Sequence, residues 1–124
     1  MTFKTLKTGT RIAGAATDSY TTSAAIHGEI KAIEVFVSAS TDFKVYTLDE
    51  AGAAWEYLLG ASGSTVTTAA SKKYYTKVLE QKMSDGTDLT TYTNAVINNK
   101  IKIDASNLTA ADTWSVNIIY EDNY

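Results

Sequence analysis

Alternating apolar and polar residues near the end of the chain predict two strands. One face of residues 112–121 carries the large side chains Trp114, Val116, Ile118 and Tyr120. Residues 100–104, Lys-Ile-Lys-Ile-Asp, alternate in the same way. Because only the polar loop 105–111 separates the two segments, we expect them to pair as a C-terminal antiparallel hairpin.

Two further strands are predicted before this hairpin. Residues 29–38 are apolar on both faces and change phase near Ile33, which indicates either a central strand covered on both sides or a β-bulge. Residues 95–97 form a short strand that leads into Asn98-Asn99. Asparagine tolerates positive φ better than most residues, so this pair suits a tight turn.

A second hairpin is predicted in the middle of the chain. Residues 43–49 and 54–60 alternate as strands, and residues 50–53 form the turn between them. The alternative is a short helix over residues 48–59. Gly52 would lie inside that helix, so we favour the hairpin.

The remaining segments carry weaker patterns. Residues 74–81 read as a strand that ends at the turn 84–87, with a helix over 69–83 as the alternative. Two weak strands are expected in the first 25 residues, over 3–7 and 19–23.

Together these elements predict an all-β fold. Strands recur every 10 to 15 residues with short turns between them, and the chain has no proline to demote any of them. We expect a single antiparallel β-sandwich or a jelly-roll-like barrel with a short N-terminal arm. Residues 1–16 form the arm or a first edge strand, and residues 17–124 form the sandwich.

Composition supports this fold and narrows the function. The 124 residues suffice for one domain, and the 29 threonines and serines, with eight tyrosines, favour pleated surfaces. The absence of cysteine excludes disulfides and thiol chemistry. A net charge of −3 argues against nucleic-acid and membrane partners. No secretory signal is visible, so we expect the protein to act where it is made, or in something assembled there.

Charge is uneven along the chain. Residues 1–16 contain three basic residues, Lys4, Lys7 and Arg11, and no acidic one. Charge blocks of this kind are usually solvated faces. The sharper hypothesis is that this basic segment docks on an acidic neighbour.

No catalytic, cofactor or metal site is predicted, and we do not expect an enzyme. The acid pairs at residues 49–50 and 121–122 fall at strand ends, where solvated turns are expected. Asp85 and Asp88 lack the rest of a calcium-loop pattern. His27, the single histidine, precedes a glycine and suits a structural role.

The aromatic residues leave one binding role open. Trp55, Tyr74, Tyr75 and Tyr92 could stack on sugars or on single-stranded bases. Packing in the core and at its rim explains them as well, and we favour that interpretation.

Several short motifs follow one another in a familiar order. Residues 27–33 read His-Gly-Glu-Ile-Lys-Ala-Ile, residues 73–78 read Lys-Tyr-Tyr-Thr-Lys-Val, and residues 115–121 read Ser-Val-Asn-Ile-Ile-Tyr-Glu. Over residues 25–121 the chain resembles small β-sandwich structural proteins of tailed bacteriophages and related viruses, often capsid-associated. Thr76 stands where that group often has proline.

The resemblance implies a capsid decoration, or cement, protein. Such a protein would be made in the host cytoplasm and would bind the major capsid protein on the exterior of an icosahedral shell. It would form a homo-oligomer, a trimer or a dimer, and would need no cofactor. Separately, on the charge of residues 1–16 alone, we hypothesise that Lys4, Lys7 and Arg11 contact the shell or a neighbouring copy. The alternatives are a tail, head-fibre or connector subunit of the virion and a carbohydrate-binding β-sandwich module.

Overall fold

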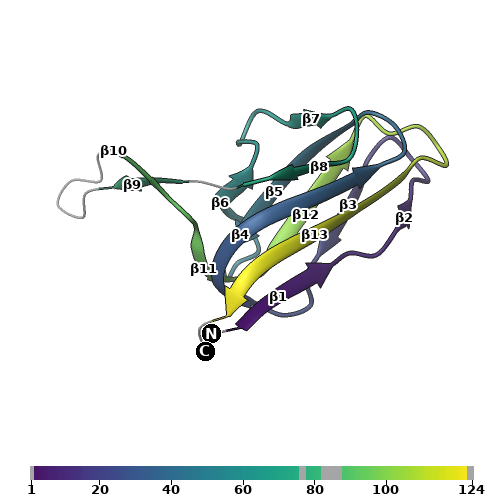
Figure 1. Cartoon of the computed structure of the whole chain (residues 1–124). Coiled ribbons are helices and arrows are strands. Elements are labelled where there is room, and N and C mark those ends of the chain that lie inside the picture. Colours follow the sequence, from purple (N-terminus) through teal and green to yellow (C-terminus); the bar gives the residue numbers. More distant parts are fainter. Residues whose placement is uncertain (1, 76–77, 82–87, 123–124) are drawn as a thin grey trace.

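The computed structural model of the chain consists of two antiparallel sheets packed face to face (Figure 1). The structure describes the backbone of residues 2–75, 78–81 and 88–122, and the side chains of residues 2–75 and 93–122. This part of the chain contains no helix. The prediction of an antiparallel β-sandwich is confirmed, and the strands do not close into a barrel.

The first sheet, sheet A, has a four-strand path with two short additions (Figure 1). Its order is β1 (Thr2–Lys7), β13 (Thr113–Asp122), β4 (Ile26–Val37) and β11 (Val96–Asn99). In addition, β2 (Arg11–Ile12) pairs with β13, and β8 (Lys72–Tyr74) pairs with β4.

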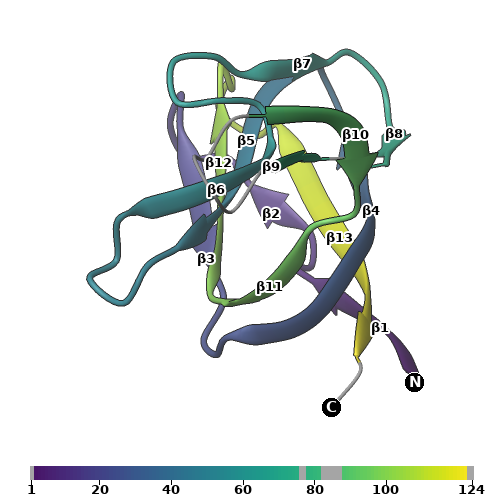
Figure 2. The ribbon, with the colours of Figure 1, turned by 90° about the vertical axis from the view of Figure 1, so that its left-hand side faces the viewer.

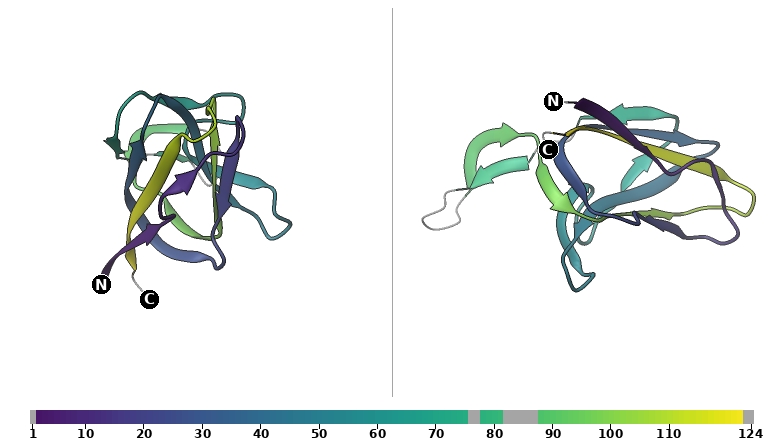
Figure 3. Two further views of the ribbon diagram at one scale, coloured as in Figure 1. Left: turned by 90° about the vertical axis from the view of Figure 1, so that its right-hand side faces the viewer. Right: turned by 90° about the horizontal axis from the view of Figure 1, so that it is seen from below.

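The second sheet, sheet B, lies across the core from sheet A (Figure 2). Its order is β3 (Asp18–Thr21), β12 (Ile101–Ser106), β5 (Thr41–Leu48) and β6 (Ala54–Leu59), and β7 (Val66–Thr68) also pairs with β5. Among the described strands, β9 (Val78–Gln81) and β10 (Asp88–Thr93) pair only with each other. Their hairpin projects away from the sandwich (Figures 1 and 3).

The core lies between the two sheets and is built by alternate residues of four long strands. The largest fully buried side chains include Ile30, Ile33 and Val35 of β4, Phe43 and Val45 of β5, Ile101 and Ile103 of β12, and Trp114, Val116 and Ile118 of β13. Phe43 and Trp114 meet edge to face across the core, with ring centroids 5.7 Å apart. Burying each large side chain stabilises the fold by roughly 1.5–3 kcal/mol.

The predicted C-terminal hairpin is wrong, although both of its strands exist. Strand β12 pairs with β3 and β5 in sheet B, whereas β13 pairs with β1, β2 and β4 in sheet A. The intervening loop therefore crosses from one sheet to the other, with positive φ at Asn107 and Ala111. The apolar faces of the two strands do not lie side by side but face each other through the core.

The predictions for residues 98–99 and 74–81 are also wrong, because these residues pair with other strands than expected. Asn98 and Asn99 do not form a tight turn but belong to β11, where they pair with His27 and Ile26 of β4. The single strand expected over residues 74–81 is two strands, since β8 joins sheet A and β9 joins the projecting hairpin. For the same reason the alternative helix over 69–83 is wrong. The turn predicted at residues 84–87 lies outside the described residues.

The central hairpin is confirmed, and its alternative, the helix over residues 48–59, is wrong. Strands β5 and β6 pair antiparallel through a turn in which the Gly52 N–H donates to the Asp49 carbonyl (3.0 Å). The Ala53 N–H donates to Oδ1 of the Asp49 side chain (2.8 Å). The two weak strands near the N-terminus are also present, as β1 and β3.

The bulge alternative for residues 29–38 is confirmed. The register of β4 against β13 shifts between Ile119, opposite Ala32, and Tyr120, opposite Ile30. Lys31 is the extra residue of a β-bulge, which accounts for the change of phase in the sequence.

Candidate functional site

The basic N-terminal segment lies along β13 as an edge of sheet A and does not project as an arm (Figure 1). Strand β1 pairs with β13 without a break, from Thr2 opposite Asp122 to Lys7 opposite Asn117. Its even-numbered residues face the core side, where Leu6 packs against the core cluster. Its odd-numbered residues Phe3, Thr5 and Lys7 therefore point to the outer face of the sheet, and all three are exposed.

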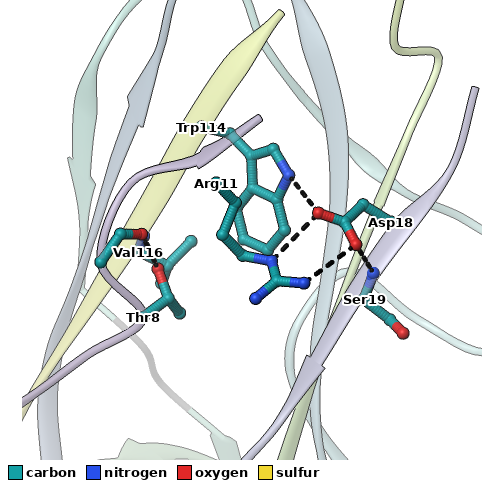
Figure 4. Close-up of polar contacts among 7 residues, drawn as sticks. Thr8, Arg11, Asp18, Ser19, Trp114 and Val116 are labelled. Atoms are coloured by element: carbon teal, nitrogen blue, oxygen red, sulfur yellow. Dashed lines mark hydrogen bonds and ion pairs between the residues drawn. The ribbon is translucent and has the colours of Figure 1, made fainter. Parts of the chain in front are cut away.

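A β-bulge separates β1 from β2. Lys7 is opposite Asn117, and Arg11 is opposite Trp114. Arg11 lies four residues after Lys7, whereas Trp114 lies only three residues before Asn117, so the N-terminal segment contains one extra residue. Gly9 has φ 71, the left-handed conformation that such bulges favour. The Thr8 N–H donates to the Val116 carbonyl, and the Val116 N–H donates to Oγ1 of Thr8, both at 3.0 Å (Figure 4). The extra residue brings Arg11 opposite Trp114.

Arg11 is held within the sandwich by one carboxylate and two aromatic rings. Its Nε and Nη2 donate to Oδ2 and Oδ1 of Asp18 at 3.0 and 3.2 Å (Figure 4). Its guanidinium carbon lies 5.6 Å from the ring centroids of Tyr20 and of Trp114. These contacts join the edge of sheet A to strand β3 of sheet B.

The carboxylate of Asp18 accepts four hydrogen bonds. Besides the two bonds from Arg11, it accepts from Nε1 of the buried Trp114 (3.1 Å) and from the backbone N–H of Ser19 (2.8 Å) (Figure 4). The bond from Arg11 is the main cause that holds the pKa of Asp18 below its usual value, and the same bond raises the pKa of Arg11. We interpret Arg11 as a structural residue, because its charge is paired with Asp18 within the protein and is not offered to a partner.

Lys4 and Lys7 differ from Arg11 and from each other. Nζ of Lys4 lies 2.6 Å from Oδ2 of Asp122, and this hydrogen bond raises the pKa of Lys4. Lys7 is exposed at the end of β1. The three predicted contact residues thus share one segment, but Lys4 and Lys7 lie on opposite faces of its strand and the structure does not gather them into one patch.

The sequence pattern does not predict that Asp18 binds Arg11. A signal for the pair was present, because Arg11 is the only arginine and Asp18 is the only acidic residue before Glu29. The spacing of seven residues matches no local motif, so only the tertiary fold brings the pair together.

The sequence pattern also does not predict the buried carboxylate of Glu121. Glu121 is only 5% exposed although it lies near the end of β13. Nζ of Lys31, the bulge residue of β4, lies 3.1 Å from Glu121 and 3.2 Å from Glu29. Glu121 is the main cause that raises the pKa of Lys31. The bulge therefore places a cation between two carboxylates.

The candidate aromatic platform is divided between the sheets. Trp55 is 70% exposed on β6 of sheet B, whereas Tyr75 is 69% exposed next to β8 of sheet A. Tyr74 is half-buried, and its hydroxyl shares a 2.8 Å hydrogen bond with Oγ1 of Thr68. The side chain of Tyr92 lies outside the described part of the chain. Trp55 and Tyr75 thus belong to different sheets.

A polar cleft of about 510 Å³ lies beside β3 and β12. It is lined by Thr17, Asp18, Ser19, Lys44, Thr65, Asp104, Ala105 and Ser106. Asp18 is engaged as described above, and Oδ2 of Asp104 accepts a 2.6 Å hydrogen bond from the Tyr46 hydroxyl. Burial and this bond raise the pKa of Tyr46. Both carboxylates of the cleft thus already have donors within the protein.

The acidic candidates whose side chains are described form no clustered site, and the side chains of Asp85 and Asp88 lie outside the described residues. Asp49 accepts bonds within its turn, while Glu121 and Asp122 are paired with lysines. His27 is exposed on β4. Among the side chains that the structure describes, no group of three acidic or histidine residues is placed to hold a metal ion.

Comparison with known proteins does not assign the chain to a family. No protein-family model matches the chain, and no curated protein matches its sequence. No helix in the described ranges is long and apolar enough to cross a membrane. The class established by the fold is an antiparallel β-sandwich, and the function is inferred from its surfaces.

Proposed function

We propose that the protein is a structural protein of a virus particle, a decoration protein that binds the major capsid protein on the outer surface of the shell. The observation that carries this proposal is the β9–β10 hairpin, which projects from the sandwich and pairs with no other described strand. A two-stranded hairpin alone is marginally stable in water. A hairpin in this position therefore suits a contact with a partner.

Charge and fold are consistent with this role. A net charge of −3 suits the exterior of a shell better than an interior facing nucleic acid, where phosphates would repel the protein. A small sandwich that repeats over many equivalent sites gains binding strength from multivalency and needs only a modest contact at each site. A tail, head-fibre or connector position in the virion would use the same hairpin.

The exposed Trp55 favours a second candidate function, carbohydrate binding. The other tryptophan, Trp114, is buried against Phe43, so an added sugar that changes the fluorescence would report on Trp55. A carbohydrate-binding module shows quenching that Trp55→Ala abolishes. A decoration protein shows no change with any sugar.

The decisive experiment is co-sedimentation of the purified chain with capsid shells that lack it. Binding that saturates at a fixed small number of copies per capsid subunit is expected. A variant with residues 78–93 replaced by a short Gly-Ser linker should still show the circular dichroism of a folded β-sandwich and should lose binding. The matched control, Ala51→Ser in the exposed β5–β6 turn, should bind normally.

Two outcomes contradict the proposal. Absence of binding excludes shell decoration and favours the tail, fibre or carbohydrate functions. Full binding by the linker variant places the contact elsewhere than on the hairpin.

A further inference from the structure

Strand β1 leaves one side of its backbone unpaired among the described strands. The Thr8 N–H points to β13, since it donates to the Val116 carbonyl. Backbone groups of successive residues in a strand point to opposite sides, so Leu6 and Lys4 also face β13. Phe3, Thr5 and Lys7 therefore direct their N–H and C=O groups to the open edge of sheet A.

We propose that this edge pairs with β1 of a second copy of the chain, antiparallel, about a two-fold axis at Thr5. In this register Thr5 lies opposite Thr5 of the second copy, and Phe3 lies opposite Lys7 in both directions. All three residues with outward backbone groups are paired. The two copies of sheet A then form one continuous sheet.

The side chains of β1 are complementary in this register. On the outer face, each Lys7 packs against the ring of a Phe3, which is 65% exposed in the single chain. On the other face, each Lys4 lies opposite a Leu6. Threonine pairs opposite each other stabilise antiparallel strands. No lysine lies directly opposite another lysine.

Neighbouring registers are less favourable. An axis at Lys4 places the two Lys4 side chains directly opposite each other, which is destabilising. An axis at Leu6 takes Phe3 out of the pairing, because its partner would be Gly9, inside the bulge. The axis at Thr5 alone uses the whole strand.

The other edges of the sandwich are poorer templates. Strands β3 and β11 have only four residues each. Strand β6 follows β5 with two register shifts, which twist an edge and discourage pairing. Strand β1 has six residues, no proline and no register shift. Its central charge is partly compensated, because Lys4 is paired with Asp122. This dimer is independent of the proposed virion function, since it forms in the isolated chain.

The test is the mass of the isolated protein by analytical ultracentrifugation. We expect the natural chain to reach twice 13.4 kDa as its concentration rises. Thr5→Pro removes an outward N–H and leaves the bonds to β13 intact, so it should be folded and monomeric. The matched control Thr5→Val should remain a dimer. Circular dichroism and thermal unfolding verify that both variants are folded.

Two further variants test the register. Phe3→Lys places a lysine opposite Lys7 and should weaken the dimer, whereas Phe3→Lys combined with Lys7→Glu should restore it. Thr5→Cys introduces the only cysteine of the chain at the axis, where opposite Cα atoms lie about 5.5 Å apart and a disulfide fits. Oxidation should link two copies.

Three results would overturn the proposal. The first is a natural chain that stays monomeric at its highest soluble concentration. The second is a dimer that Thr5→Pro leaves unchanged, which would place the interface elsewhere. The third is a failure of Lys7→Glu to rescue Phe3→Lys, which would exclude this register.

Discussion

Among single residues, Asp18 stands out because its carboxylate accepts four hydrogen bonds. It connects a cation from β2, the indole of β13 and the start of β3, so three strands from both sheets meet at one carboxylate. Charge-assisted bonds of this kind are stronger than neutral ones. Arg11 and Asp18 are partly exposed, so solvent screening reduces the contribution of the pair.

Replacing Arg11 should destabilise the fold without unfolding it. Arg11→Met keeps an unbranched apolar stem but removes the ion pair and both cation–π contacts. We expect a loss of about 1 to 2 kcal/mol in the free energy of unfolding. Urea denaturation at fixed protein concentration measures this loss. Lys100→Met, at an exposed position, should change it by less than about 0.5 kcal/mol; equal effects of the two substitutions would refute the structural role of Arg11.

The same carboxylate should give the stability a pH dependence. The folded-state pKa of Asp18 is lowered, so its contribution is complete above the ordinary value of about 4 and is lost as pH falls through the folded-state pKa. Asp18→Asn should therefore be about 1 to 2 kcal/mol less stable than the natural chain at pH 7. The difference should shrink below pH of about 4.

Denaturation curves of both chains across this pH range provide the test. The asparagine of the variant can still accept a hydrogen bond from the Trp114 indole. Any difference in stability that remains at low pH is therefore caused by altered side-chain geometry and not by the lost charge. A difference that stays constant with pH would show that the carboxylate charge contributes nothing.

At the scale of elements, β4 organises sheet A. It pairs with β13, β11 and β8, and its bulge at Lys31 keeps Ile30 and Ile33 both on the core side. Near its start, the backbone of Gly28 passes very close to β13. The pairing of β4 with β13 thus depends on the bulge at Lys31 and on the absence of a side chain at Gly28.

Gly28→Ala should be strongly destabilising. Gly28 has φ 147, and an added Cβ would clash with the backbone carbonyl oxygen of Glu121. Backbone strain and displacement of β13 together should cost roughly 2 to 4 kcal/mol, measurable as a lowered Tm. The control is Gly14→Ala, since an added Cβ there meets nothing within 4 Å. Similar Tm values for the two variants would contradict the close approach of β4 to β13.

At the scale of the whole molecule, the sequence predicts strands better than it predicts their partners. Alternation locates β5, β6, β12 and β13. A run that is apolar on both faces locates β4, and its change of phase correctly indicates a bulge. Alternation states only that one face of a strand is buried. A strand beside its neighbour and a strand facing it across a core give the same pattern, so a short loop made β12 and β13 look like a hairpin.

The candidate site shows the same limit. A block of like charge in residues 1–16 is visible in the sequence. Whether each cation points to solvent, to a carboxylate or into a ring depends on register and on a bulge, which are tertiary properties. Arg11 is therefore structural, Lys4 is paired and Lys7 is exposed, although the three are similar in the sequence.

The arrangement of the two sheets can be tested with introduced disulfides, because the natural chain has no cysteine. Lys44 lies directly opposite Asp104 on neighbouring strands of sheet B. Opposite residues in antiparallel strands have Cα atoms about 4.5–5.5 Å apart, within the range that a disulfide spans. Lys44→Cys combined with Asp104→Cys should therefore form an intramolecular bond on oxidation, seen as faster migration in a non-reducing gel.

The matched control distinguishes the sandwich from a C-terminal hairpin. Lys102 and Ser115 lie on outward faces of opposite sheets, but they would be neighbours if β12 paired with β13. Packed sheets are about 10 Å apart, and outward side chains diverge further, so Lys102→Cys combined with Ser115→Cys should form no intramolecular bond. A bond in this second variant would mean that β12 and β13 pair with each other, and the absence of a bond in the first would contradict the pairing of β5 with β12.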